Sequence, residues 1–172
     1  MIFRPTYTID SIYNLDINAL KNMGIKAIFS DLDNTLLAWN NFETDDSLQK
    51  LERRLADADI KLIVISNNSS ERISKVLDVY RIEFAARARK PLPIGINNAI
   101  AKYKLNKSDV LMVGDQLLTD IVAGNLAGVR TVLVKPLVKT DKWNTRINRC
   151  VEKFIFFVFR FTNPIKFEEH LK

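Results

Sequence analysis

Two aspartates and a threonine follow the first long apolar stretch of the sequence. Residues 25–29 are mostly apolar, and Asp31, Asp33 and Thr35 come directly after them. Asp is a poor strand former and is costly to bury without a partner. Because residues i and i+2 of a strand share a face, the two carboxylates repel each other unless a cation draws them together. The spacing therefore predicts a cation site. The alternative is an Asp-Asn turn in which Asp33 caps the next segment.

Further polar residues follow later apolar stretches or lie in the loops between them: Ser66 and Asn67 after 61–65, Lys90 in a basic loop, and Asp115, Gln116 and Asp120 after 110–113. Singly, each has an ordinary interpretation: Ser66 as a helix cap, Lys90 as a solvated lysine, Asp120 as a cap or ion-pair partner. In an open parallel sheet, however, the carboxyl ends of the strands form the edge where ligands bind. The presence of all these polar residues at the same edge of the sheet indicates a phosphate-transfer site.

Apolar strands alternate with segments of helical length between residues 25 and 134. Strands are predicted at 25–31, 61–66, 82–86, 110–113 and 131–134, and helices at 44–59, 71–80, 94–103 and 116–125. This alternation is typical of βαβ units, and continuous apolar strands indicate a sheet covered on both faces. We therefore predict an α/β Rossmann-like three-layer sandwich with a mostly parallel sheet.

The predicted domain organisation has three parts. Residues 1–24 are a lead-in that packs on the body, with a short helix capped by Asp16 and ended by Gly24. Residues 25–144 form the catalytic domain, and residues 145–172 form a C-terminal tail. With 172 residues, 47% hydrophobic and 27% charged, the chain is large enough for one full core.

The tail is basic and aromatic. Residues 135–172 hold nine Lys and Arg against four Asp and Glu, so this region carries most of the chain's net charge of +6. Phe154–Phe159 is continuously apolar, with Phe161 just beyond, and basic residues flank it. Residues 150–161 are either a terminal element that covers the sheet or an interfacial anchor on an anionic membrane surface.

Cysteine content and hydropathy indicate the cellular compartment. The single cysteine, Cys150, excludes an intramolecular disulfide and fits a reducing compartment. No signal-peptide pattern opens the sequence, and no apolar run approaches the roughly 20 residues that span a bilayer. We expect a cytoplasmic protein, with peripheral contact at the inner face of the membrane through the tail.

Four of these polar groups, in this order, resemble the motifs of the haloacid-dehalogenase superfamily of phosphotransferases. The matching residues are DLDNT at 31–35, Ser66, Lys90, and GDQLLTD at 114–120. More narrowly, DLDNTLLAW, SNNSSER, RKPLP and VGDQLLTDIVAGN are similar to the YqeG-type phosphatases, which are related to mitochondrial phosphatidylglycerophosphate phosphatases of fungi and plants. The narrower resemblance covers nearly all of residues 1–150, and no catalytic position departs from it.

The residues support a two-step phosphoryl transfer. Asp31 would be the nucleophile that forms an aspartyl-phosphate. Asp33 would protonate the leaving oxygen and later take a proton from water. In the resembling superfamily, Asp at this second position points to hydrolysis of a phosphomonoester. Lys90 would neutralise charge on the phosphate and on the nucleophile.

The remaining candidates bind the phosphate or the metal. Thr35, Ser66 and Asn67 are expected to contact phosphoryl oxygens. Mg²⁺ would lie between Asp31, the main-chain carbonyl of Asp33, and Asp115, because hard cations prefer oxygen ligands. Supporting roles are expected for two further residues, Asp120 and Gln116.

The motif spacing leaves no room for a large cap domain, so the site should be open to a bulky substrate. We expect phosphatidylglycerophosphate, an anionic lipid, rather than nucleic acid as a partner. Phosphoproteins, nucleotides and nucleic-acid ends remain alternative substrates. Two non-enzymatic alternatives are a receiver-like phosphorylatable switch and a silent membrane adaptor. The DxD spacing and the serine at the end of 61–66 disfavour the switch, and the presence of every reacting group disfavours the adaptor.

Overall fold

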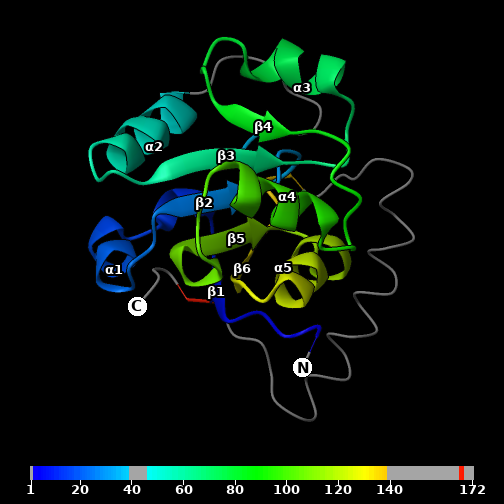
Figure 1. Cartoon of the computed structure of the whole chain (residues 1–172). Helices are drawn as coiled ribbons and strands as arrows, with labels where there is room; N and C mark the ends of the chain where they lie inside the picture. Colours follow the sequence, from blue (N-terminus) through cyan, green and yellow to red (C-terminus); the bar gives the residue numbers. More distant parts are fainter. Residues whose placement is uncertain (1, 39–45, 139–166, 169–172) are drawn as a thin grey trace.

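The protein is built on one six-stranded sheet. The computed structural model describes residues 2–38, 46–138 and 167–168 (Figure 1). The strands are β1 (Tyr7–Ile9), β2 (Ala27–Ser30), β3 (Lys61–Ile65), β4 (Glu83–Ala85), β5 (Val110–Gly114) and β6 (Arg130–Val134). Their order is β1-β6-β5-β2-β3-β4, and every pairing between these strands is parallel.

Helices cover both faces of the sheet. They are α1 (Ile17–Asn22), α2 (Asp46–Ala56), α3 (Ser70–Leu77), α4 (Ile94–Lys102) and α5 (Val122–Ala127), with short turns η1 (Ile12–Asn14), η2 (Lys107–Asp109) and η3 (Leu117–Ile121). Strand side chains alternate between two buried clusters, since successive residues point to opposite faces. Ile28 packs with α1, α2 and α3, whereas Ala27 and Phe29 pack with α4 and α5. The predicted three-layer α/β fold is confirmed.

The lead-in supplies a strand that the sequence did not reveal. β1 pairs with β6 at the edge of the sheet. Thr6, directly before β1, and Thr131 of β6 form two hydrogen bonds with each other: the main-chain amide of each donates to the hydroxyl of the other at 3.1 Å. The predicted caps of α1 are present: Asp16 accepts from two amides of the first turn, and Gly24 adopts a φ of +70°.

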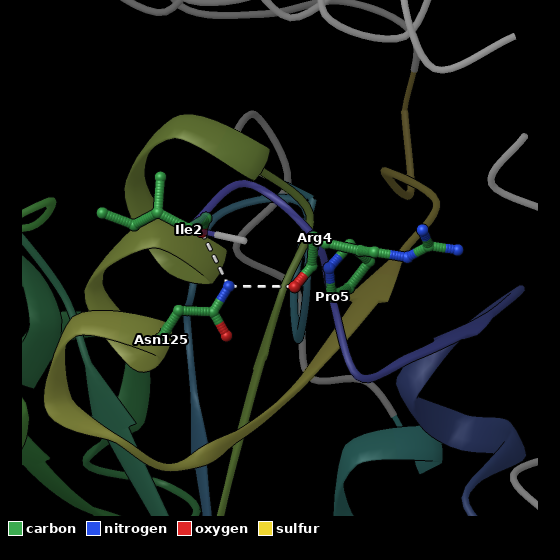
Figure 2. A pocket seen from close by; sticks show the side chains of 4 residues that line it. All are labelled: Ile2, Arg4, Pro5 and Asn125. Carbon is green, nitrogen blue, oxygen red and sulfur yellow. Dashed lines mark hydrogen bonds between the residues drawn. The ribbon is translucent and has the colours of Figure 1, made fainter. Parts of the chain in front are cut away.

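A side chain of α5 fixes the segment before β1. The Asn125 amide group donates to the carbonyl oxygens of Ile2 and Arg4, at 2.7 and 2.9 Å. Figure 2 shows these bonds at the wall of an open pocket of about 470 Å³, which Pro5 also lines. Asn125 also accepts a bond from Thr131, the second residue of β6, so the pocket lies near the amino ends of β1 and β6.

Two residues of the predicted tail lie against the sheet edge. The main-chain amide of Glu168 donates to the carbonyl of Thr8 at 3.0 Å, and its main-chain carbonyl accepts from the amide of Asp10 at 3.1 Å. Phe167 packs beside Leu117, Ile121 and Leu133. The aromatic stretch within 150–161 lies outside the described residues. Among the helices of the described part, none has the length and apolar character needed to cross a bilayer.

The chain between the motifs is short. From Asp31 to Ser66 the described residues form a loop, α2 and β3, and from Ser66 to Lys90 they form α3 and β4. Within these described residues, therefore, no large cap domain interrupts the core, as the spacing predicts.

Candidate active site

The strand order creates a crevice at the carboxyl end of β2. The chain proceeds from β2 to β3 and β4 on one side, and then returns to place β5 on the other side of β2. Loops leave in opposite directions at such a switch point, and ligands bind between them. Ser30 lies opposite Val64 of β3 and Val113 of β5. The polar residues that follow β2, β3 and β5 therefore leave the sheet at one level.

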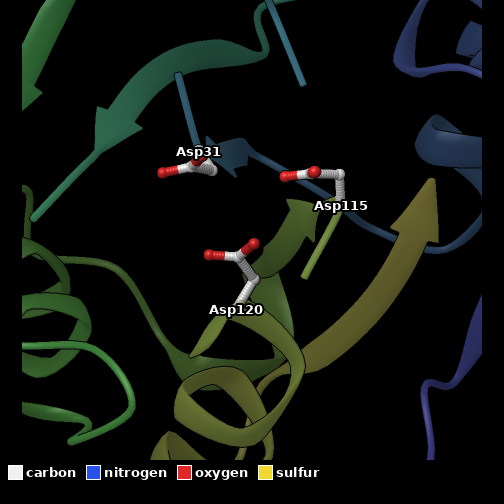
Figure 3. A group of neighbouring side chains, drawn as sticks. All are labelled: Asp31, Asp115 and Asp120. Carbon is white, nitrogen blue, oxygen red and sulfur yellow. The ribbon is translucent and has the colours of Figure 1, made fainter. Parts of the chain in front are cut away.

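Three carboxylates meet in this crevice. One oxygen from each of Asp31, Asp115 and Asp120 lies within 4.8 Å of the others. Figure 3 shows the three side chains at the ends of β2 and β5 and on the turn that follows β5. All three residues are buried, and Asp120 is 0% exposed. Three buried acids in one place require cations, because isolated buried charge is strongly unfavourable.

Lys90 supplies one of these cations from the opposite side of the crevice. Its ammonium group lies 2.7 Å from an oxygen of Asp31 and 2.7 Å from an oxygen of Asp120, and its side chain is 3% exposed. Burial lowers the pKa of Lys90, but the charges of Asp120 and Asp31 outweigh burial and raise it above its usual value. Lys90 therefore stays protonated at neutral pH.

The pKa of Asp31 lies well above that of an ordinary aspartate. Burial raises the pKa of Asp31 to about 6, the attraction of Lys90 opposes this rise, and the neighbouring charge of Asp120 adds to it. The carboxylate form thus depends on the cations around it. A second cation beside Asp31 would oppose the rise in its pKa, as Lys90 does, and would keep the carboxylate oxygen nucleophilic.

The Asn67 side chain fixes the backbone of Lys90 instead of pointing to a free oxygen site. Its amide nitrogen donates to the carbonyl of Lys90, and its oxygen accepts from the amide of Lys90, both at 2.8 Å. We expected Asn67 to contact phosphate. In the structure both of its polar groups bond to the backbone of Lys90 and so hold this residue in place, while the contact with phosphate stays a prediction.

Two residues that the sequence reasoning missed hold Asp33. The Asn68 side chain donates to one carboxylate oxygen of Asp33 at 2.8 Å, and Arg72 lies 3.3 Å from the other. The Asp33 side chain is 21% exposed and that of Arg72 is 36%, so this pair faces solvent more than the three buried acids do. Asn68 lies two residues before α3 and Arg72 lies in its first turn, so no helical spacing in the sequence singled out this pair.

The hydroxyl residues occupy buried places around Asp31. Thr35 donates to a carboxylate oxygen of Asp115 at 3.3 Å, and so helps to orient this acid. Ser66 accepts bonds from the main-chain and side-chain nitrogens of Asn68 at 3.2 and 3.1 Å. Its own hydroxyl proton can still be donated to an oxygen in the crevice. The loop turns at Asn34, which has a φ of +63°, a conformation that Asn tolerates better than most residues.

Gly114 permits the close approach of Asp120. A β-carbon at Gly114 would lie 2.3 Å from the Cβ, Cγ and Oδ2 atoms of Asp120, closer than any real contact. Asp120 lies in η3, a single turn of π-helix, where the sequence predicted the first turn of an α-helix. Such turns are frequent at functional sites. The second carboxylate oxygen of Asp120 accepts a hydrogen bond from the main-chain amide of Gln116 at 3.1 Å.

The variant Gly114→Ala is therefore expected to displace Asp120 from Lys90 and to lower kcat by about 100-fold, the usual effect of misplacing a group by one ångström. The measurement is steady-state hydrolysis of p-nitrophenyl phosphate. Gly24→Ala is the control, because Gly24 has a positive φ but open space around it. It should lose stability and keep its kcat. Equal kcat values for both variants would contradict the assigned contact.

The residues present fit a divalent metal ion. The donor set consists of carboxylate oxygens, which suit hard cations such as Mg²⁺. Gln116, directly after Asp115, carries a buried side-chain oxygen without a hydrogen-bond partner among the described residues. A hydrated cation in the crevice would supply donors for it. The cluster combines two predicted ligands, Asp31 and Asp115, with Asp120 rather than with the side chain of Asp33.

Comparison with known proteins agrees with this geometry. A family model described as HAD-hydrolase-like matches residues 87–150. The chain is 34% identical over 167 residues to the probable phosphatase YqeG of Bacillus subtilis, covering 97% of each chain. It is 29% identical over 147 residues to phosphatidylglycerophosphate phosphatase 1 of Arabidopsis thaliana, covering 80% of this chain and 42% of that protein. The second relative is therefore more than twice as long as the matched region.

The fold also matches a solved phosphatase structure. The cobalt-bound deoxy-D-mannose-octulosonate 8-phosphate phosphatase of Haemophilus influenzae superposes with a TM-score of 0.50 and 18% identity, covering 67% of this chain and 70% of that one. At this identity the likeness concerns the fold alone. The relatives that are phosphatases by name favour the enzymatic interpretation over the receiver-like switch and the silent adaptor.

Proposed function

The chain belongs to the YqeG-type phosphatases of the haloacid-dehalogenase superfamily, and from this premise we propose that it is a Mg²⁺-dependent phosphatidylglycerophosphate phosphatase acting through Asp31. Membership makes it a phosphoric monoester hydrolase. The lipid substrate, the metal and the roles of single residues are the content of the proposal.

The observation that supports the mechanism most is the contact of Lys90 with Asp31. A buried carboxylate within 2.7 Å of a buried ammonium group is oriented, partly neutralised and kept ionised. Asp33, two residues on, is more exposed and lies outside this pair. One acid is thus arranged to attack, and the other to exchange protons with the leaving group and with water.

In the first step, an oxygen of Asp31 attacks phosphorus and the bond from phosphorus to the ester oxygen breaks. Asp33 gives its proton to that departing oxygen. The Ser66 hydroxyl and Lys90 would stabilise the equatorial oxygens of the phosphoryl group, where negative charge gathers. Asn68 and Arg72 would hold Asp33 in position.

In the second step, a water molecule attacks the phosphorus of the aspartyl-phosphate. Asp33 takes a proton from this water, the bond from phosphorus to the Asp31 oxygen breaks, and inorganic phosphate leaves. Asp31 and Asp33 return to their starting states. Asp120 acts through Lys90 by holding its ammonium group at 2.7 Å.

Asp31, Asp115 and the main-chain carbonyl of Asp33 would hold Mg²⁺. When bound, the metal supplies positive charge that screens the nucleophile from the phosphate dianion. Thr35 orients Asp115 for this purpose, and Gln116 would accept a hydrogen bond from water beside it. Each of these side chains is placed by the ends of β2 and β5.

The lipid substrate is supported by the relatives and by the open site. The Arabidopsis relative is a phosphatidylglycerophosphate phosphatase by name, and the described residues contain no inserted cap above Asp31. A phosphate carried on a headgroup could reach an uncapped site. A cytoplasmic location, with peripheral contact of the 145–172 tail at the inner face of the membrane, belongs to the same proposal, as does the division at residues 24 and 144.

A substrate panel tests the proposal. Phosphate release is measured from phosphatidylglycerophosphate and phosphatidic acid in mixed micelles, and from glycerol phosphate, a nucleotide and a phosphopeptide in solution. We expect the highest kcat/KM for phosphatidylglycerophosphate. A soluble ester or the phosphopeptide as the best substrate would contradict the lipid specificity, while the membership in a phosphatase family would stand.

A further inference from the structure

Some exposed apolar side chains follow strands at the edge of the sheet that carries the crevice. In the described residues, the large apolar side chains that are exposed are Ile2, Val79, Leu92, Ile94, Leu126 and Leu137. Three of these, Leu92, Ile94 and Leu137, follow the carboxyl ends of β4 and β6, at the same edge of the sheet as the acids. Their exposed fractions are 51%, 41% and 39%.

Backbone contacts tie these residues to the catalytic loops. The amide of Leu137 donates to the carbonyl of Asn34 at 2.9 Å, within the loop that follows Asp31. Leu92 lies two residues after Lys90, and its amide donates to the carbonyl of Arg89 at 2.9 Å. Leu137 thus lies beside the DxDxT loop and Leu92 beside Lys90, on segments held by hydrogen bonds.

Two exposed arginines lie in the same loop as Leu92. Between Arg87 and Lys90, exposed arginines alternate with buried Ala88 and Lys90. The Ala88 amide donates to the carbonyl of Ser66 at 3.0 Å, and the Ala88 carbonyl accepts from Gly95 at 3.1 Å. The inward residues are fixed, and Arg87 and Arg89 are directed outward. Residues 84–108 contain no Asp or Glu, and the acid that faces this loop from α3 is Glu71, whose pKa the charge of Arg87 helps to lower.

We propose that the docking rim, formed by Arg87, Arg89, Leu92, Ile94 and Leu137, binds an anionic phospholipid surface and so presents the crevice to headgroup phosphates. Aliphatic side chains on loop tips can enter the boundary between headgroups and acyl chains, while arginines meet the lipid phosphates. Two exposed arginines beside exposed aliphatic side chains complement an anionic bilayer, and the rim lies at the edge of the sheet that carries the crevice.

The inference rests on the proposed lipid phosphatase only for the identity of the substrate, because docking can be measured without turnover. The full chain is sedimented with vesicles of phosphatidylcholine alone, and with vesicles of equal parts phosphatidylcholine and phosphatidylglycerol. Two double variants remove the rim, Arg87→Gln with Arg89→Gln, and Leu92→Ser with Leu137→Ser. All four residues are exposed, so both variants are expected to fold.

Matched controls stand near the opposite edge of the sheet. Arg53→Gln with Arg81→Gln removes two exposed arginines from α2 and from the turn before β4, and Val79→Ser removes an exposed apolar side chain. These controls should bind the mixed vesicles as the wild type does. If the controls lost as much binding as the rim variants, the proposal would be overturned, because vesicle binding would then depend on overall net charge or hydrophobicity and not on the rim.

On the mixed vesicles, the arginine variant should bind about 30-fold more weakly, given the usual effect of two basic residues at an anionic surface. The leucine variant should bind about tenfold more weakly. For both, the ratio of kcat/KM on vesicle lipid to kcat/KM on p-nitrophenyl phosphate should fall. Wild-type affinity in both rim variants would overturn the docking rim. The substrate preference would then stand or fall by its own panel.

Discussion

Asp31→Asn is expected to abolish phosphatase activity, with kcat lowered by about 10⁴-fold or more, the scale seen when a nucleophile is removed. Asn is nearly isosteric with Asp, but its amide cannot form an acyl phosphate. The fold should remain, because Asp120 still pairs with Lys90 at 2.7 Å. The measurement is p-nitrophenyl phosphate turnover together with the thermal unfolding temperature.

The pKa of Asp31 sets the sign of the accompanying stability change. Since folding raises this pKa from 3.8 to about 6, the ionised carboxylate opposes folding above pH 6, and stability falls as pH rises from 4 to 6. In metal-free protein, Asp31→Asn should flatten this fall. Asp78→Asn, an exposed acid at the end of α3, is the matched control and should keep its activity. Turnover by Asp31→Asn within a few-fold of wild type would refute the nucleophile.

Removal of the metal should have the second largest effect. We expect EDTA to stop turnover and Mg²⁺ to restore it, because two negative groups, Asp31 and the phosphate dianion, must approach each other. Asp115→Ala removes a ligand from the buried cluster and should raise the Mg²⁺ concentration for half-maximal activity by about tenfold or more. Full activity in the presence of chelator would contradict this account.

A readout without turnover separates metal binding from catalysis. A ligand that binds only the folded state raises the unfolding temperature, so Mg²⁺ should stabilise the wild type. The same addition should stabilise Asp115→Ala much less. Asp109→Ala is the control, because Asp109 pairs with Lys26 before β5, at the opposite edge of the sheet. An equal Mg²⁺ response in both variants would place the metal elsewhere.

The sequence predicted the sheet because its central strands are continuous apolar runs. Residues 62–65 and 110–113 are buried on both faces, and the boundaries of β3 and β5 agree with prediction to within one residue. β1 was missed, because three residues carry too little periodicity. Its pairing depends on Thr131 and Asn125, more than 100 residues away.

The contacts inside the site were less predictable than its members. Polar residues at strand ends pointed to the carboxyl edge, but only the strand order decides which loops face each other. The sequence suggested Asn67 as a phosphate ligand, for example, but it could not reveal the two bonds of this side chain to the backbone of Lys90. Arg72 looked like an ordinary helix residue until Asp33 was placed 3.3 Å away. The π-turn at Leu117–Ile121 was hidden for a similar reason, since its sequence also suits an α-helix.

The central claim is a covalent phosphoryl intermediate on Asp31, and trapping it is the most direct test. Full-length protein is mixed with excess phosphomonoester, quenched in acid during turnover and reduced with borohydride, which converts an aspartyl-phosphate to homoserine. The account predicts homoserine at position 31, dependent on substrate and on Mg²⁺, with Asp33, Asp115 and Asp120 unchanged. Reduction at another residue, or unmodified Asp31 during active turnover, would contradict it.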